Sequence, residues 1–210
     1  VDPSTFFQTQ QRSYMQFAAD SFKALPASQI ADWNDAIALT GFTSQNALGD
    51  SYVPSAKQVF TMMALNLSRL NNLPTTPDLG KFIADPNLPG LTVEAVEVGT
   101  VVGPPVSLGT LELQNASSTV AGRLEVAATL PIQATIRNYK KYTRIIGDYP
   151  ITPTPSTIDT ASEYLLRFTG VDWVDAVGQV IGVKGRVVSS DTGLAGSWLY
   201  FGTYVVPAAV

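Results

Sequence analysis

Asp172 and Asp175 flank Trp173, and these residues come closest to a catalytic arrangement. Two carboxylates beside an aromatic ring are the kind of site with which glycosidases cleave sugars. The short spacing favours another role, because carboxylates so close together in a turn accept hydrogen bonds from nearby backbone amides. The ligand-dense spacing of a calcium loop is also missing. We therefore expect both aspartates to cap a loop, and we assign no catalytic residue.

Other common reactive groups are absent from the chain. It contains no histidine and no cysteine, which excludes a Ser-His-Asp triad, thiolate metal sites and disulfides. Gly99 and Gly103 enclose a short glycine motif, but the lysine and helix of a phosphate-binding loop do not follow it. We expect no cofactor, no metal and no enzymatic activity.

A basic segment with interleaved tyrosines covers residues 137–144. Its candidate interface residues are Arg137, Tyr139, Lys140, Lys141, Tyr142 and Arg144. Basic and aromatic side chains together can bind nucleic acid, but the net charge of −4 is not that of a general nucleic-acid binder. Lys and Arg also protect strand edges from pairing with other chains. We therefore expect a strand edge or a contact with an acidic protein, and we disfavour nucleic acid.

Trp173, Trp198 and Tyr200 are candidates for a ligand-stacking platform. Aromatic rings offer large, flat contact surfaces. These three residues support an alternative function, a module that binds a carbohydrate or a receptor.

Three amphipathic helices are expected in the first third of the chain. Apolar residues recur at helical spacing over 4–25, 28–40 and 54–70. Ser28 is the expected N-cap of the second helix and Gly41 its stop, while a proline opens the third. Asn66 lies on the apolar stripe of the third helix, and we expect it to bond to a neighbouring backbone group.

The hydrophobic period changes from helical to two after Leu91, which predicts strands. The clearest are 124–130, 181–187 and 198–206, and the last two read as a hairpin with a long polar loop. Shorter candidates lie at 93–98, 110–114, 142–146 and 164–168. The last is ambiguous, because residues 160–163 resemble a helical capping box; we favour a strand.

Residues 73–90 contain four prolines and few periodic positions, which predicts an extended connector. The expected architecture is therefore α+β, with a helical region over 1–72, this connector, and a β domain over 91–210. Many short strands with Gly and Pro turns indicate an antiparallel β-sandwich of immunoglobulin or fibronectin-III type.

The composition is poor in charge. Charged residues make up 14% of the chain and hydrophobic residues 45%, against a charged share of about 25% in average soluble proteins. Such a surface is compatible with a subunit partly covered by neighbours. No apolar run approaches the roughly 20 residues of a membrane helix, and residues 1–4 lack the features of a signal peptide. We expect no membrane partner.

The chain resembles structural proteins of bacteriophages and prophages that continue from a helical region into a fibronectin-like β domain. Residues 25–33 and 145–147 and the 180–206 hairpin carry this resemblance, together with Gly41, Tyr52, Phe60, Asn66 and Leu70. It implies a non-catalytic virion protein that packs against other virion proteins, as a minor capsid, decoration or tail-associated subunit. We expect a homo-oligomer or a lattice-bound subunit; the carbohydrate- or receptor-binding alternative would place the chain outside the cell or at its surface.

Overall fold

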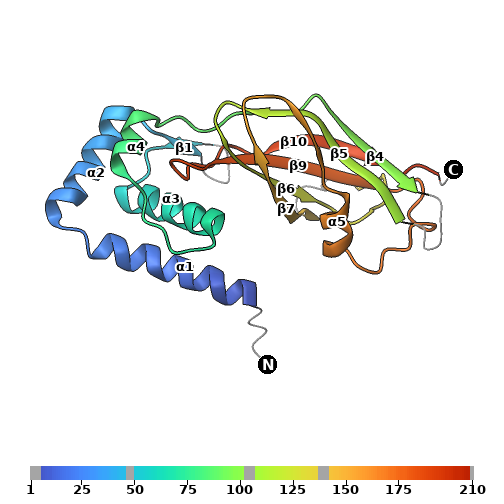
Figure 1. Ribbon diagram of the computed structural model, residues 1–210, viewed down its shortest axis with the longest axis horizontal. Coiled ribbons are helices and arrows are strands. Elements are labelled where there is room, and N and C mark those ends of the chain that lie inside the picture. The colour runs from blue at the N-terminus through green and yellow to red at the C-terminus, as the bar shows by residue number, and fades with distance from the viewer. Residues whose placement is uncertain (1–5, 46–49, 102–106, 137–141, 209–210) are drawn as a thin grey trace. The chain divides into compact units, whose positions relative to one another are not determined.

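The computed structural model describes residues 6–45, 50–101, 107–136 and 142–208, which combine helices with antiparallel strands, as the α+β prediction requires (Figure 1). Two compact units are present. The helical unit comprises the chain up to Leu88 together with Ser189–Ala195, and the β unit comprises Pro89–Val188 and the residues from Gly196 onward. The loop 189–195 therefore joins the helices, although its sequence position suggested the β domain.

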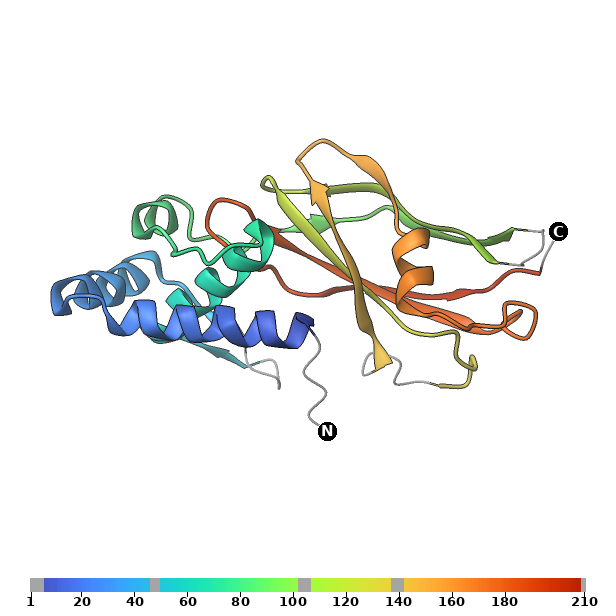
Figure 2. The ribbon, with the colours of Figure 1, turned by 60° about the horizontal axis from the view of Figure 1, so that its bottom comes forward.

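The described residues of the helical unit form four helices and a pair of two-residue strands. In chain order these are α1 (Phe6–Lys23), α2 (Ala27–Thr40), β1 (Ser44–Gln45), β2 (Ser51–Tyr52), α3 (Ala56–Asn71) and α4 (Leu79–Ala84). Helices α1 and α3 lie side by side (Figures 1 and 2). The three long helices confirm the predicted ones, whereas α4 contradicts the extended connector expected over 73–90.

Local capping explains where the helices begin and end. Ser55 caps α3 in a reciprocal box with Gln58: the Ser55 amide donates to Gln58 Oε1 at 2.8 Å, and the Gln58 amide donates to Ser55 Oγ at 3.4 Å. The proline before Ser55 thus lies outside the helix. Helix α2 begins at Ala27 without a side-chain cap, so the expected Ser28 cap is wrong. Gly41 ends α2 in the left-handed conformation, with φ of 61°, as predicted.

Aromatic side chains form the centre of the helical core. Phe60 of α3 makes edge contacts with Phe22 and Trp33, with ring centroids 5.4 and 5.5 Å apart. Phe82 of α4 is fully buried and stacks on Trp33 at 5.7 Å. Helix α4 forms because the Asp78 carboxylate accepts hydrogen bonds from the first amides of the helix.

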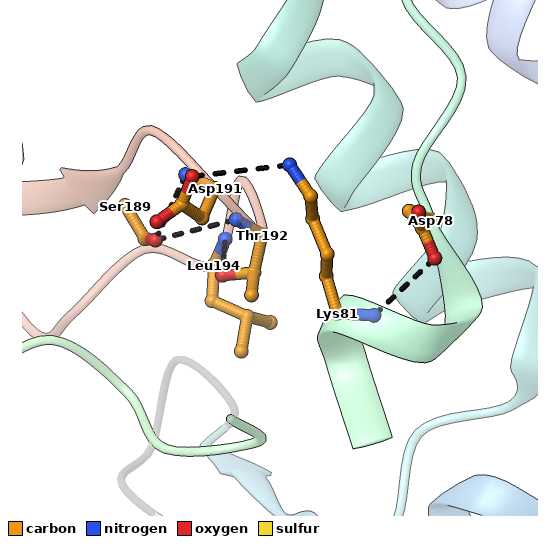
Figure 3. Close-up of polar contacts among 6 residues, drawn as sticks. All are labelled: Asp78, Lys81, Ser189, Asp191, Thr192 and Leu194. Atoms are coloured by element: carbon orange, nitrogen blue, oxygen red, sulfur yellow. Dashed lines mark hydrogen bonds and ion pairs between the residues drawn. The ribbon is translucent and has the colours of Figure 1, made fainter. Parts of the chain in front are cut away.

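The loop 189–195 completes this core. Leu194 is fully buried in the helical cluster, and Asn66 Nδ2 donates to the Gly193 carbonyl at 2.8 Å, which confirms the backbone bond expected of Asn66. Gly193 has φ of 75°, and a Cβ there would lie 2.6 Å from the Met63 carbonyl oxygen, so only glycine fits. At the rim of the loop, Lys81 Nζ lies 3.8 Å from Asp191 (Figure 3).

The loop is also held by bonds of its own. The Ser189 hydroxyl oxygen accepts from the amides of Asp191 and Thr192, both at 3.3 Å. Thr192 Oγ1 in turn accepts from the Leu194 amide at 3.2 Å (Figure 3). These short-range bonds pre-shape the turn that presents Leu194.

In the β unit, the part of the chain that the structure describes forms eight strands and one helix. They are β3 (Leu91–Thr92), β4 (Ala95–Val101), β5 (Ser107–Ser118), β6 (Gly122–Ala128), β7 (Arg144–Ile151), β8 (Ser156–Asp159), α5 (Ala161–Arg167), β9 (Val180–Ser189) and β10 (Leu199–Val205). One sheet has the order β10-β9-β6-β7. In the other, β5 pairs with β3 and β4 and also with β8. The predicted 181–206 hairpin is confirmed as β9 and β10.

One hydrophobic core receives side chains from both sheets. Alternate residues of β5, β6 and β9 point into it, for example Leu111, Leu124 and Val183, all fully buried. Helix α5 adds Tyr164, whose hydroxyl donates to the Thr129 carbonyl at 2.7 Å.

The predicted strand at 164–168 is wrong, because α5 occupies this segment. The capping-box pattern was the correct signal for a helix, although the chemistry differs. The Thr160 hydroxyl donates to the Leu111 carbonyl at 2.7 Å instead of capping, and the Asp159 carboxylate accepts from the Ala161 amide at 2.9 Å. Sequence analysis also missed β8, whose short polar sequence has no apolar alternation.

Leu194→Ala should destabilise the helical unit by about 2–5 kcal/mol, because it opens a cavity in the buried core. The measurement is hydrogen exchange of the α3 amides, with the β6 amides as an internal reference. Leu39→Ala is the matched control; its side chain is 79% exposed, and we expect a change within about 0.5 kcal/mol. Unchanged α3 protection in Leu194→Ala would contradict this role of the loop.

Candidate interaction surfaces

Asp172 acts as a loop cap. Its Oδ1 accepts hydrogen bonds from the Val174 and Asp175 amides at 2.9 and 3.4 Å. Both aspartates are exposed, and Trp173 between them points the opposite way, into the core. The capping role predicted for both aspartates is thus confirmed for Asp172, whereas Asp175 takes part through its backbone amide and carbonyl.

Trp173 does not belong to a ligand platform. Its side chain is 5% exposed and packs on Tyr164 with ring centroids 6.0 Å apart. The prediction that grouped it with Trp198 and Tyr200 is therefore wrong for this residue. A tryptophan in a polar turn reads as a surface residue in sequence, but here it anchors the turn to the core.

Trp198 and Tyr200 do lie together, beside two basic residues of the neighbouring strand. Lys184 Nζ lies 4.6 Å from the centre of the Trp198 ring and 5.2 Å from that of Tyr200. The Arg186 guanidinium lies 4.8 Å from the Trp198 ring. We call these four residues the cation–aromatic row. Cations at such distances are attracted to the ring faces.

The two cations of the row differ in their partners. Arg186 Nε donates to Glu125 Oε2 of β6 at 2.6 Å, and the Glu125 side chain is only 5% exposed. Within the described ranges, Lys184 has no carboxylate at ion-pair distance. In the cation–aromatic row, the Lys184 ammonium thus contacts two aromatic rings, and no described carboxylate neutralises its charge. The alternation of Lys184 and Arg186 along a predicted strand was the signal that placed both on one face.

A shallow groove of about 230 Å³ lies beside the row, between β4 and β10. Its apolar lining comes from Val93, Val96, Leu199, Phe201 and Tyr204, and Glu94 and Tyr200 add polar atoms. In the sheets as described, β4 and β10 each pair with one strand. A bulge between Tyr200 and Gly202 interrupts the register of β10, a feature that discourages edge-to-edge pairing.

The segment 161–177 carries exposed aliphatic side chains on a fixed backbone. Leu166 is 78% exposed, Val174 66% and Val177 40%. Tyr164 and Trp173 hold the same segment to the core from its inner side. Three exposed aliphatic side chains thus occur within one short segment that is anchored to the core.

The basic segment is only partly described. Arg137, Tyr139, Lys140 and Lys141 lie outside the described residues. Tyr142 is 48% exposed and Arg144, also exposed, begins β7. Strand β7 ends its sheet, so Arg144 lies at a strand edge, one of the two places expected for the segment, whereas Tyr142 lies in a turn before the strand.

The described residues contain no group of three or more Asp and Glu side chains placed to hold a metal ion. In the same part of the chain, no helix has the length and apolar character needed to cross a membrane.

One buried tyrosine and one partly buried tyrosine are expected to make the stability of the β unit depend on pH in alkali. Burial raises the pKa of Tyr164 above its ordinary value. Burial also raises the pKa of Tyr149, and the nearby Glu163 carboxylate, which accepts its hydroxyl at 3.3 Å, raises it further. Both phenols therefore favour the neutral form in the folded chain more than in the unfolded chain.

The stability that these phenols contribute should be complete below pH of about 10, the pKa of an unfolded tyrosine, and should fall as pH rises beyond it. Each phenol that stays neutral in the folded chain lowers the free energy of unfolding by up to about 1.4 kcal/mol for each pH unit above this value. Urea unfolding at pH 9, 10 and 11 measures the loss. Tyr164→Phe should lose less stability over this range than Tyr52→Phe, whose side chain is 40% exposed; equal losses would refute the assignment.

Trp173→Ala should lower the free energy of unfolding by about 3–5 kcal/mol, because it empties a core position. Trp198→Ala should lower it by only about 1 kcal/mol, the scale of cation–ring contacts at a half-exposed site. Urea denaturation followed by circular dichroism measures both. Similar losses in the two variants would contradict the separation of a core tryptophan from a surface one.

Comparison of the chain with protein-family models, with curated proteins and with solved structures finds no significant match.

Proposed function

We propose that this chain is a non-catalytic virion structural protein, a minor capsid, decoration or tail-associated subunit that acts by packing against other proteins. The observation that carries this proposal is the exposure of three aliphatic side chains, Leu166, Val174 and Val177, on one short segment. These side chains stand on a segment whose inner side is held by Tyr164 and Trp173. A partner that covers them gains hydrophobic burial at little cost in ordering the segment.

The scarcity of charge supports the same proposal. Only 14% of the residues are charged, and the charged residues tend to be depleted at the centres of protein interfaces. Placement in a virion, next to other virion proteins, rests on the resemblance of residues 25–33 and of the C-terminal hairpin to phage structural proteins. An oligomer or a lattice-bound subunit follows from that placement.

The finer classification as an immunoglobulin- or fibronectin-III-like sandwich belongs to this proposal. Its support is the strand pairing when β3 and β4 are counted as one first strand. The first, second and fifth strands then share one sheet, and the third, fourth, sixth and seventh share the other. An immunoglobulin constant domain divides its strands similarly, except that its fourth strand lies beside the fifth.

A carbohydrate- or receptor-binding module is the second candidate. Trp198 and Tyr200 favour it, because they lie next to each other and are half-buried. Lys184 and Arg186 already occupy positions over the Trp198 ring, so a sugar would have to stack on a ring surface that these cations leave open. Binding to a broad glycan array that Trp198→Ala abolishes would favour this candidate over packing.

The packing proposal is tested with the Leu166→Glu, Val174→Glu double variant. We expect the wild-type chain to form defined oligomers, rings or filaments, seen by light scattering over a wide concentration range and by negative-stain microscopy. The double variant should associate at least tenfold more weakly with an unchanged melting temperature, because both side chains are exposed.

Leu39→Glu is the control for this test, since it adds the same charge at another exposed leucine. A wild-type chain that stays monomeric at every concentration and is absent from purified virus particles would overturn the proposal. An equal loss of association in Leu39→Glu would remove the 161–177 segment as its basis.

A further inference from the structure

We infer that the cation–aromatic row of one copy binds the acidic outer face of the β4-β5-β8 sheet of a second copy, so that copies associate head to tail. This inference rests on the proposed structural function and names the partner as the chain itself. It uses residues of the β unit alone, on the two sheet faces that point away from the shared core.

The outer face of the second sheet carries a row of three carboxylates. Glu97 of β4 lies directly opposite Glu112 of β5, and Glu112 lies directly opposite Asp159 of β8. Partners in antiparallel strands point to the same face, so the three side chains form one line across the sheet. We call them the acidic row.

The surroundings do not neutralise the acidic row. Strands β3, β4, β5 and β8 contain no Lys or Arg, and none occurs in the sequence from Phe82 to Gly122. Among the described residues, no cation lies within ion-pair distance of the row. Gln114 Nε2 donates to Glu97 at 3.3 Å and to Glu112 at 2.9 Å, but an amide orients the carboxylates without cancelling their charge.

Like charges directly opposite each other destabilise a sheet. The acidic row is thus a cost to the single chain, and a cation supplied from outside would relieve it. The same β unit offers such a cation on its other sheet. Lys184 lies over the rings of Trp198 and Tyr200 with no described carboxylate beside it.

The two faces are complementary in more than charge. Trp198 and Tyr200 add flat apolar area around the Lys184 ammonium, which excludes water and strengthens the contact between opposite charges. Each copy has both a cation–aromatic row and an acidic row, so the contact joins two different surfaces. Such a heterologous contact generates rings or filaments, depending on whether the rotation closes.

Charge exchange between two variants tests this inference. In the Lys184→Glu variant, the new glutamate of one copy should be repelled by the acidic row of another copy of the same variant. In the Glu97→Lys, Glu112→Lys double variant, the two new lysines of one copy should be repelled by Lys184 of another copy. Each should therefore associate at least tenfold more weakly than wild type in light scattering. An equimolar mixture should recover association, because each contact again joins opposite charges.

Neutral variants keep the inference testable if a reversed charge disturbs folding. Glu112→Gln should raise the melting temperature by a few °C, since it relieves repulsion across the strands, and yet weaken association. Its association should also depend less on salt between 50 and about 500 mM. Lys57→Glu and Asp35→Lys, at exposed positions of the helical unit, are the charge controls.

The outcomes separate this inference from the proposed function. One outcome would overturn the charged contact alone. In that outcome the mixed charge variants fail to associate, while the wild-type chain still associates and loses association in the Leu166→Glu, Val174→Glu variant. Wild-type chains that never associate would overturn the inference, and their absence from purified virus particles as well would overturn the proposed function. Stronger association of Glu112→Gln than of wild type would also overturn the inference, because the acidic row would then act only as a repulsive surface.

Discussion

The loop 189–195 is the constraint on which the helical unit depends, because its core is closed by a residue from the far end of the chain. Asn66 and Gly193 are joined across 127 positions, and Leu194 fills space among aromatic side chains of the first 88 residues. Long-range closure of this kind costs chain entropy and slows folding. The helices therefore reach their full stability only when the β9–β10 hairpin has formed and its tip is shaped.

Local signals account for most of what the sequence could predict about the fold. The Gly41 stop, the helix of residues 56–71 and the 180–205 hairpin all follow from caps, periodicity and turns within a few residues. Helix α4 was not predicted, because the prolines on both sides of it indicate a loop and only one of its residues, Phe82, is a buried apolar residue that could reveal a helical period. The place of Leu194 could not be predicted, since nothing near it in sequence distinguishes a loop leucine that enters a distant core.

The candidate surfaces were predictable where strand alternation applies and unpredictable where tertiary packing decides. Trp198 and Tyr200 share a face because they are two residues apart at the start of β10. The same two-residue spacing places Lys184 with Arg186. Trp173 lies in a turn without periodicity, so its orientation depends on tertiary packing against Tyr164. Cross-strand neighbours such as Glu97 and Glu112 require the register, which periodicity does not supply.

The charges of the β unit are few but strongly segregated. One sheet carries acids and no bases on its strands, while the other pairs Arg186 with Glu125 and Arg123 with Asp148 and leaves Lys184 among aromatic rings. In a solitary protein, carboxylates aligned across a sheet repel one another, and mixing acidic with basic residues would remove the repulsion. Segregation becomes favourable when a neighbour provides the opposite charge. A chain with so little charge to distribute can then fix the orientation of its contacts with a few charged residues, while exposed aliphatic side chains provide most of the association energy.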